Sequence, residues 1–142
     1  MIILDTNVLS ELMKPADLCS AAVTHWMKKQ RTDDVFTTTM TLAEILAGIY
    51  YLQDKDRRKK PLLTIAGQIF SQLFSGRVLP FDDAAAHMFA DIVTERRKRG
   101  LHYAPLDIQI AAVAKARGMA VATRNTSAFE ESGIDVIDPW SS

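Results

Sequence analysis

The order of apolar patterns along the chain is the feature that most restricts its fold. Short runs of β-prone residues alternate with longer segments whose apolar residues recur every three or four positions. The first run, residues 1–4, is continuously apolar like a strand buried on both faces, and it ends at Asp5. Strands that alternate with helices favour parallel pairing through right-handed crossovers. The sequence therefore predicts an α/β fold with a mostly parallel sheet of about five strands, covered by helices on both faces.

The remaining elements follow from the same patterns. Further strands are expected at residues 35–39, 77–81, 119–123 and 136–137. Helices are expected over residues 22–27, 41–52, 61–74, 84–99 and 105–117. Proline at the first helical position and glycine after the last one are typical of helix boundaries, here Pro61, Pro105, Gly76, Gly100 and Gly118. Asp82 or Asp83 can cap the helix at 84–99.

Length and composition narrow the class of protein. The 142 residues suit one domain spanning 1–142, and 48% hydrophobic with 24% charged residues excludes a disordered or collagen-like chain. The single Cys19 cannot form an internal disulfide or a multi-cysteine zinc site, which favours a reducing cytoplasm. The start carries no basic leader, and no run of eighteen apolar residues occurs, so we expect neither secretion nor a membrane partner.

Net charge gives no argument for a nucleic-acid partner, because 17 basic residues balance 17 acidic ones. The distribution is more informative, since residues 57–60 and 96–99 are each four consecutive arginines or lysines. Such clusters can follow a phosphate backbone. They can equally decorate the solvated end of a helix, where the dipole favours cations at the C-terminus. The sequence leaves both interpretations open.

Three carboxylates are predicted to meet at one edge of the sheet. Asp5 closes the first strand, Glu44 lies near the start of the helix after the second strand, and Asp107 lies in the first turn of a later helix. In parallel α/β layers these positions share the edge at which ligands bind. Clustered carboxylates repel one another unless a cation neutralises them, and oxygen ligands without sulfur suit Mg²⁺ or Mn²⁺. We expect a metal site at Asp5, Glu44 and Asp107.

Each carboxylate also has a purely structural interpretation. Thr41 and Glu44 match a capping box, in which the glutamate binds backbone rather than metal. Asp107 at a helix start is favoured by the helix dipole alone. Asp5 differs, because a carboxylate at the end of a buried strand is costly to desolvate. The convergence of all three, rather than any single one, carries the functional interpretation.

The strand at 119–123 brings a neutral group to the same edge. Asn125 can orient a water or bind metal through its carbonyl, although it is also a common turn residue. Its neighbour Arg124 is the best placed candidate for a phosphate contact. Thr6 and Asn7 are expected to form a turn whose side chains hold Asp5.

Five segments together resemble the PIN-domain family, and within it the VapC-type toxins of the FitB-like branch. The similarity covers nearly the whole chain, in residues 3–10, 41–45 with Gly48, 106–114, 121–125 and 138–140. It implies a three-layer α/β/α fold and Mg²⁺- or Mn²⁺-dependent endoribonuclease activity on RNA such as tRNA. It also implies a homodimer, a cognate antitoxin of a type II toxin–antitoxin system, and contact with DNA only through that antitoxin.

Carried onto matching positions, the resemblance makes Asp5 and Asp107 the main metal ligands. Glu44 becomes a ligand or water-orienting base, Asn125 the fourth catalytic position, and Thr6 and Asn7 supports for substrate and site. Family members often have another acid after the fourth motif, where this chain has Ala128 and then Glu130 after one further residue. The number of metal ions therefore stays open.

Two rival functions and one surface prediction remain. The segment at 5–9 also resembles the opening of haloacid dehalogenase-like phosphatases, but Asn7 stands where those enzymes carry a second aspartate. A PIN-fold protein that binds RNA or antitoxin with little or no catalysis is the other alternative.

The helices at 41–52 and 62–74 carry Tyr50, Tyr51, Phe70 and Phe74, more large apolar groups than one helix face needs. We interpret Tyr51 as part of a dimer interface, and for Phe70 and Phe74 core packing is an equal alternative.

Overall fold

The first strand lies at the centre of a five-stranded sheet in the order β3-β2-β1-β4-β5, and all four pairings are parallel. The computed structural model describes residues 1–142. Its strands are β1 (Ile2–Leu4), β2 (Val35–Thr38), β3 (Val78–Leu79), β4 (Ala120–Ala122) and β5 (Val136–Ile137). The predicted α/β class and strand positions are confirmed, although each strand except the last is shorter than expected.

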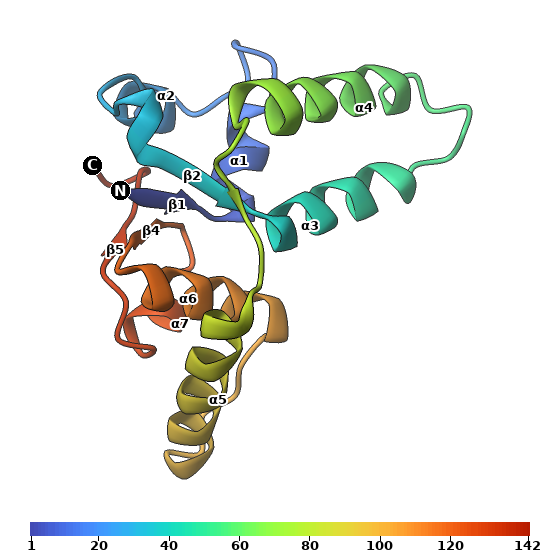
Figure 1. Cartoon of the computed structure of the whole chain (residues 1–142). Helices are drawn as coiled ribbons and strands as arrows, with labels where there is room; N and C mark the ends of the chain where they lie inside the picture. Colours follow the sequence, from blue (N-terminus) through green and yellow to red (C-terminus); the bar gives the residue numbers. More distant parts are fainter.

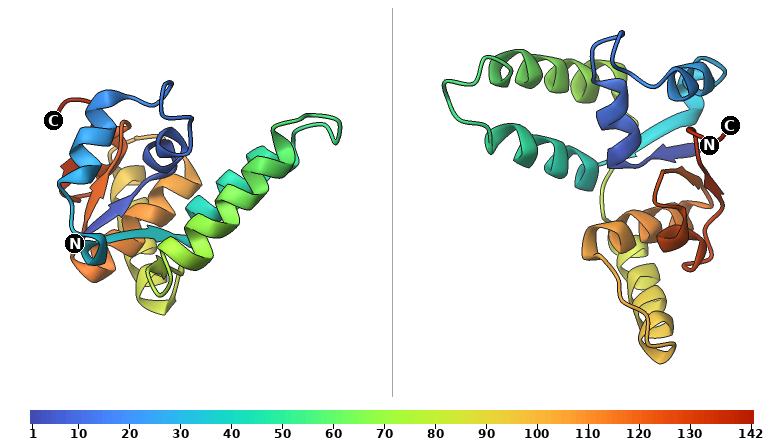
Figure 2. Two further views of the ribbon diagram at one scale, coloured as in Figure 1. Left: turned by 90° about the horizontal axis from the view of Figure 1, so that it is seen from above. Right: turned by 180° about the vertical axis from the view of Figure 1, so that it is seen from behind.

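Helices cover both faces of this sheet (Figure 1). They are α1 (Thr6–Leu12), α2 (Ala21–Lys28), α3 (Thr39–Tyr50), α4 (Lys59–Gln68), α5 (Asp83–Lys98), α6 (Pro105–Arg117) and α7 (Thr126–Glu130). A short 3₁₀ turn, η1 (Thr32–Asp34), precedes β2, and a π-helical segment, η2 (Ile69–Leu73), continues α4. The pair α3 and α4 extends away from the sheet as an arm (Figure 2).

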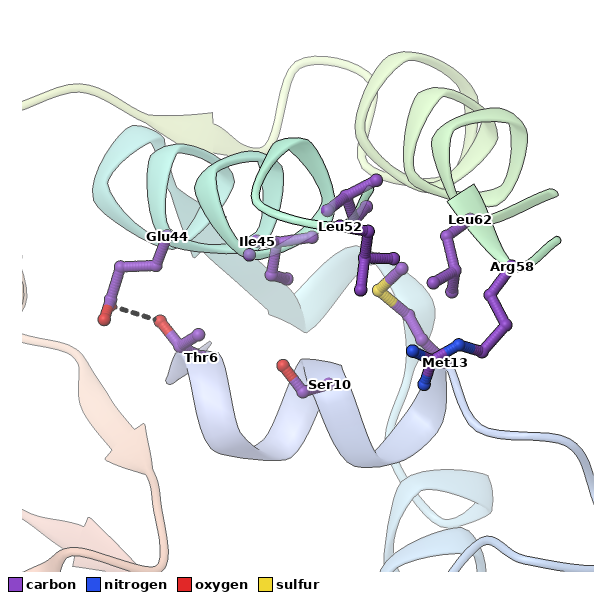
Figure 3. A pocket seen from close by; sticks show the side chains of 10 residues that line it. Thr6, Ser10, Met13, Glu44, Ile45, Leu52, Arg58 and Leu62 are labelled. Carbon is purple, nitrogen blue, oxygen red and sulfur yellow. Dashed lines mark hydrogen bonds between the residues drawn. The ribbon is translucent and has the colours of Figure 1, made fainter. Parts of the chain in front are cut away.

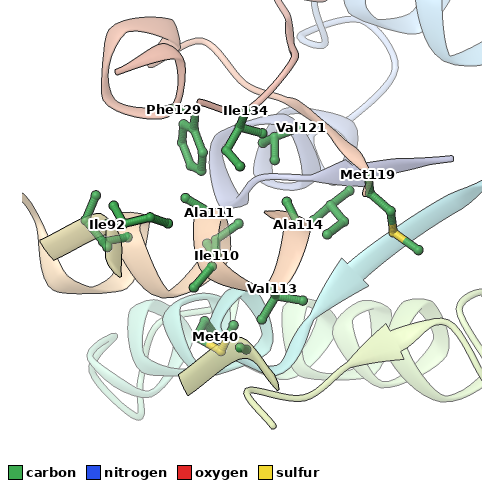
Figure 4. Close-up of a cluster of buried hydrophobic side chains, with 14 of the residues drawn as sticks. Met40, Ile92, Ile110, Ala111, Val113, Ala114, Met119, Val121, Phe129 and Ile134 are labelled. Carbon is green, nitrogen blue, oxygen red and sulfur yellow. The ribbon is translucent and has the colours of Figure 1, made fainter. Parts of the chain in front are cut away.

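Alternation along the strands builds two hydrophobic cores. Ile3 and Val121 face the layer of α5, α6 and α7, where they join a cluster of 16 buried residues (Figure 4). Leu4 and Ala122 face the opposite layer and join a second cluster of 12 buried residues. Because successive side chains of a strand point to opposite faces, one sheet separates the two cores. This is the three-layer arrangement expected from the sequence.

The second core decides between the two alternatives left open for Phe70 and Phe74. Both are buried, with 8% and 2% of their surface exposed, so they pack inside the protein rather than at an interface. The tyrosines at the end of α3 behave differently, since Tyr50 is 61% exposed and Tyr51 91%. Among these four aromatic residues, only the tyrosines offer surface to a partner.

Several helix boundaries differ from the sequence prediction. The helix α3 begins at Thr39 rather than Thr41, because the side chain of Thr38 accepts the Thr41 N–H at 3.2 Å and acts as the N-cap. The helix α4 begins at Lys59, which puts Pro61 in its third position, where a missing N–H still costs no helical bond. The helices α1 and α7 were not predicted. None of the helices has both the length and the apolar character of a membrane span.

Candidate metal and substrate site

The site lies where the strand order reverses. From β1 the chain proceeds to β2 and β3 on one side of the sheet, while β4 and β5 lie on the other side. Open α/β sheets bind ligands beyond the carboxyl ends of strands at such a switch point. Asp5 follows β1 and Thr123 follows β4, and the Asp5 N–H donates to the Ala122 carbonyl at 3.0 Å. The two side chains are therefore neighbours, although 118 residues separate them in sequence.

Asp5 is held by donors on two sides. Its Oδ1 accepts the Thr6 N–H at 2.8 Å, which makes Asp5 the N-cap of α1. Its Oδ2 accepts the Thr123 hydroxyl at 2.7 Å and the Asn7 amide at 3.4 Å. Asn7 thus holds Asp5 through its side chain, as predicted, whereas Thr6 does so through its backbone N–H. Both residues lie in the first turn of a helix rather than in a loop.

Burial dominates the electrostatics of Asp5. Its side chain is only 3% exposed, and desolvation raises its pKa from 3.8 to about 6, against the lowering effect of the Thr123 and Thr6 hydrogen bonds. The negative charges of Asp107 and Glu44 make smaller upward contributions to the same value. Asp5 is therefore a carboxylate whose ionised form lacks a compensating positive charge.

Glu44 reaches this site by a hydrogen bond to Thr6. The Thr6 hydroxyl donates to Glu44 Oε1 at 2.6 Å, and it also lies 3.2 Å from the Thr41 hydroxyl (Figure 3). The capping-box interpretation of Glu44 is wrong, since the cap is Thr38 and Glu44 lies in the second turn of α3. The Glu44 carboxylate therefore does not cap α3.

Asp107 is the third residue of α6 and is half-buried. Burial and then the Glu44 charge raise its pKa, while a hydrogen bond from Asn125 lowers it. That bond runs from Asn125 Nδ2 to Asp107 Oδ2 at 3.1 Å. The Asn125 N–H in turn donates to the Thr123 hydroxyl at 3.0 Å. Asn125 therefore links Asp107 to the residues that hold Asp5.

The structure brings Glu44 and Asp107 close enough to Asp5 for their charges to raise its pKa, and Glu44 also raises the pKa of Asp107. It does not arrange three acidic, histidine or cysteine side chains as a ready-made metal cluster. The donor set fits Mg²⁺ or Mn²⁺ in its chemistry, because it consists of carboxylate oxygens with unneutralised negative charge. A cation would offset both the burial and the smaller charge repulsion that raise the pKa of Asp5.

Arg124 lies at the rim of this site rather than against the carboxylates. Its backbone N–H donates to Asn7 Oδ1 at 3.2 Å, and its guanidinium lies 4.8 Å from the centre of the Trp140 ring. The side chain is exposed, which leaves its charge available to a ligand.

The basic tetrads differ in their roles. The tetrad at 96–99 ends α5, where cations complement the helix dipole. Its first member, Arg96, is 4% exposed and forms internal bonds, so it is not a phosphate contact. In the tetrad at 57–60, Arg58 pairs with Asp56 at 2.8 Å and Lys59 with Asp54 at 2.8 Å. Part of the positive charge of each tetrad is therefore buried or paired within the protein.

Two hydroxyl groups escaped the sequence prediction. Thr123 is fully buried and contacts Asp5, Asn7 and the Asn125 backbone, while Thr41 contacts Thr6. The sequence carried a signal for Thr123, because the parallel register that pairs Leu4 with Ala122 also places Asp5 beside Thr123. A polar residue directly after each of two apolar runs could have revealed this pair.

A groove between α1 and the arm starts at Glu44 and Thr6 (Figure 3). It continues over apolar side chains toward α4, lined by Met13, Ile45, Ile49, Leu52, Leu62 and the charged Arg58. Asp5 and Asp107 do not line it. The groove therefore leads from outer, apolar surface to one carboxylate of the site.

Comparison with known proteins agrees with this architecture. A profile of the PIN domain matches residues 2–133. The chain is 39% identical to VapC ribonuclease Y4jK of Sinorhizobium fredii, over 99% of this chain and 98% of the relative. It is 36% identical to toxin FitB of Neisseria gonorrhoeae, over 99% of both chains. It is also 33% identical to the tRNA(fMet)-specific endonuclease VapC of Shigella flexneri, over 73% of this chain and 74% of the relative.

Two solved structures superpose closely on this chain. A structure of FitAB bound to an IR36 DNA fragment superposes with a TM-score of 0.90 at 36% identity, covering 99% of this chain and 96% of that chain. A structure of DNA-bound VapBC from Salmonella typhimurium gives a TM-score of 0.77 at 27% identity, covering 97% of each chain.

Proposed function

The chain belongs to the PIN-domain family, and we propose that its single domain is a metal-dependent endoribonuclease, the toxin of a type II toxin–antitoxin pair. The observation that carries this proposal is the buried Asp5, whose pKa is raised to about 6 in the company of Asp107 and Glu44. Two relatives of the chain, one named a VapC ribonuclease and the other a tRNA(fMet)-specific endonuclease, support RNA cleavage as the reaction. Family membership also excludes the phosphatase alternative. Asn7 stands where those enzymes carry a second aspartate, and its amide donates hydrogen bonds to Asp5 and Thr123.

The metal ion, Mg²⁺ or Mn²⁺, would supply a lowered pKa for a bound water and charge stabilisation at the phosphorus. Asp5 and Asp107 would hold it, and Glu44 would hold it or orient the attacking water. Thr123 and the Thr6 N–H fix the two oxygens of Asp5, while Asn125 fixes one oxygen of Asp107. These neutral donors orient the carboxylates without competing for the cation.

The substrate in this proposal is RNA, tRNA or another structured RNA, in the cytoplasm. The exposed guanidinium of Arg124, held over Trp140 next to the site, supports a contact with a backbone phosphate. Arginine stacked on an aromatic ring keeps its N–H groups directed outward for such a bond.

An antitoxin is the proposed protein partner. The groove from Leu62 and Arg58 to Glu44 supports a bound segment whose apolar residues contact Ile45 and Leu52. A basic group of that segment, most simply an arginine, would neutralise the carboxylates that metal otherwise neutralises. Contact with DNA would come through the antitoxin, and the exposed Tyr51 supports a homodimer. FitAB and VapBC structures with DNA bound support this assembly.

Cleavage of a 5′-labelled tRNA pool tests the proposed activity. We expect cleavage with Mg²⁺ or Mn²⁺ and none with chelator. We expect no cleavage by Asp107→Asn, and wild-type cleavage by Asp91→Asn, which changes an exposed aspartate of α5. Cleavage that persists in chelator, or in Asp107→Asn, would overturn the proposal.

The alternative is a PIN-fold protein that binds RNA or antitoxin without cleaving. Two features of the site favour this alternative. The fourth position is the neutral Asn125, and the acids do not form a three-residue metal cluster. The same assay separates the two functions, since RNA binding without metal-dependent cleavage would support the alternative.

A further inference from the structure

Arg96 is a charged residue that the site described above does not use. It belongs to the basic tetrad at the end of α5, but its three neighbours are exposed whereas only 4% of Arg96 is exposed. A buried arginine is unusual unless its charge and donors are engaged. Its contacts therefore indicate what its role is.

Arg96 binds two segments that come from different parts of the chain. Its carbonyl accepts the Leu101 N–H at 2.9 Å, and its Nη2 donates to the His102 carbonyl. Its Nη1 lies 3.5 Å from the Ala128 carbonyl and 3.4 Å from Glu131 Oε2. The guanidinium thus bridges the loop after α5 and the helix α7.

Each bridged segment continues directly to a residue of the site. The loop turns back from the end of α5 to the start of α6, where Asp107 lies five residues after His102 (Figure 2). Asn125 directly precedes the helix α7 and lies three residues before Ala128. Asp107 and Asn125 are themselves joined by the 3.1 Å hydrogen bond. Arg96 therefore bridges neighbouring residues of the same two segments that this bond joins.

Stability alone does not explain this choice of residue. The Nε of Arg96 is buried and has no hydrogen-bond partner. An unpaired buried donor on a charged group lowers stability, and an apolar side chain in its place would avoid that cost. What an apolar side chain could not do is bind both segments at once.

We propose that Arg96 is a positioning residue, which fixes the spacing between the start of α6 and α7 so that Asn125 keeps the Asp107 carboxylate oriented for metal. This inference rests on the proposed function. It assigns no contact between Arg96 and RNA. Outer groups that orient metal ligands commonly change metal affinity or activity by about 10- to 100-fold when altered.

The test compares Arg96→Lys with Arg97→Lys, which makes the same change at the exposed neighbour. Mn²⁺ binding to the metal-free protein is measured by calorimetry, and kcat and KM are measured on the tRNA pool. For Arg96→Lys we expect Mn²⁺ binding and kcat each weakened roughly tenfold with KM for RNA unchanged. Arg97→Lys should match the wild type in all three.

A double-mutant cycle with Asn125→Ala separates positioning from simple packing. If Arg96 acts through Asn125, then Arg96→Lys should change Mn²⁺ affinity far less in the Asn125→Ala background than in the wild type. Equal effects in both backgrounds, or wild-type Mn²⁺ affinity in Arg96→Lys, would overturn the inference.

Two further results keep the test decisive. If Arg96→Lys does not fold, Glu131→Gln, which weakens one exposed contact of the bridge, should show a smaller effect in the same direction, and no effect would overturn the inference. If the wild type binds Mn²⁺ but cleaves no RNA, the proposed function fails while the Mn²⁺ comparison still decides the role of Arg96.

Discussion

Replacing Asp5 by asparagine should stabilise the metal-free protein at neutral pH. The folded state raises the pKa of Asp5 from 3.8 to about 6, mainly through burial. Because each pKa unit corresponds to about 1.4 kcal/mol, ionised Asp5 destabilises the fold by about 3 kcal/mol at a pH above both values. Asparagine removes that charge.

The substitution also has a cost. An amide accepts weaker hydrogen bonds from the Thr6 N–H and the Thr123 hydroxyl than a carboxylate does. We set this loss at about 1 to 2 kcal/mol, which leaves a net gain of about 1 to 2 kcal/mol at pH 7.5. For a chain of this size the gain corresponds to a rise in Tm of roughly 3 to 6 °C.

The pH dependence identifies the cause. With a folded pKa above the unfolded one, the native state binds more protons than the unfolded state between pH 3.8 and about 6. The charge penalty on the wild type therefore grows as pH rises through this window. At pH 4, near the lower end of the window, the penalty is below about 1 kcal/mol. At pH 4 native Asp5 is protonated and therefore as neutral as asparagine, so the two proteins should differ in stability by less than about 1 kcal/mol.

Thermal unfolding in chelator at pH 4 and pH 7.5 measures this change in the stability difference between Asp5→Asn and the wild type. Asp91→Asn serves as the control, because Asp91 is exposed on α5. If Asp5→Asn melts below the wild type by the same margin at both pH values, desolvation of a charged Asp5 is not the dominant effect.

Three further outcomes follow from the contacts of the site and its surface. Glu44→Gln keeps an acceptor for the Thr6 hydroxyl, so Tm should change by less than about 2 °C, while tRNA cleavage should fall by roughly 100-fold or more; near wild-type cleavage would remove Glu44 from the site. Thr123→Val should lower the free energy of unfolding in urea by about 1 to 3 kcal/mol, and more than Thr37→Val, whose buried hydroxyl makes one contact of 3.5 Å with the Leu4 carbonyl; equal losses would contradict a special role for Thr123. Sedimentation at micromolar concentration should give a dimer that Tyr51→Glu weakens, since Tyr51 is 91% exposed, and a monomeric wild type would refute the dimer.

Local patterns in the sequence were sufficient for most of the fold. The helix α6 begins and ends as predicted, because Pro105 and Gly118, at φ 64°, are strong local signals. The helix α1 was missed because Asp5 both closes β1 and caps the helix, so no linker separates the two elements. The start of α3 was misplaced because Thr38, Thr39 and Thr41 are all acceptable caps, and the end of β2 decides among them.

The candidate site was predictable to the extent that it depends on strand ends. Asp5 and its supports Thr6 and Asn7 follow from one short segment. The position of Thr123 after an apolar run was a local signal, but its bond to Asp5 and the bond from Asn125 to Asp107 also require knowing which distant strands and helices are neighbours. The same is true of Phe70 and Phe74, whose burial depends on how η2 and the residue after it pack into the second core.

Anomalous diffraction from crystals soaked in Mn²⁺ would test the central claim most directly. We expect a peak between the carboxylates of Asp5 and Asp107, at oxygen distances of about 2.0 to 2.3 Å, that disappears in Asp107→Asn crystals. A fully occupied Mn²⁺ site elsewhere, with no peak at Asp5 and Asp107, would contradict the assignment of these carboxylates as the metal site.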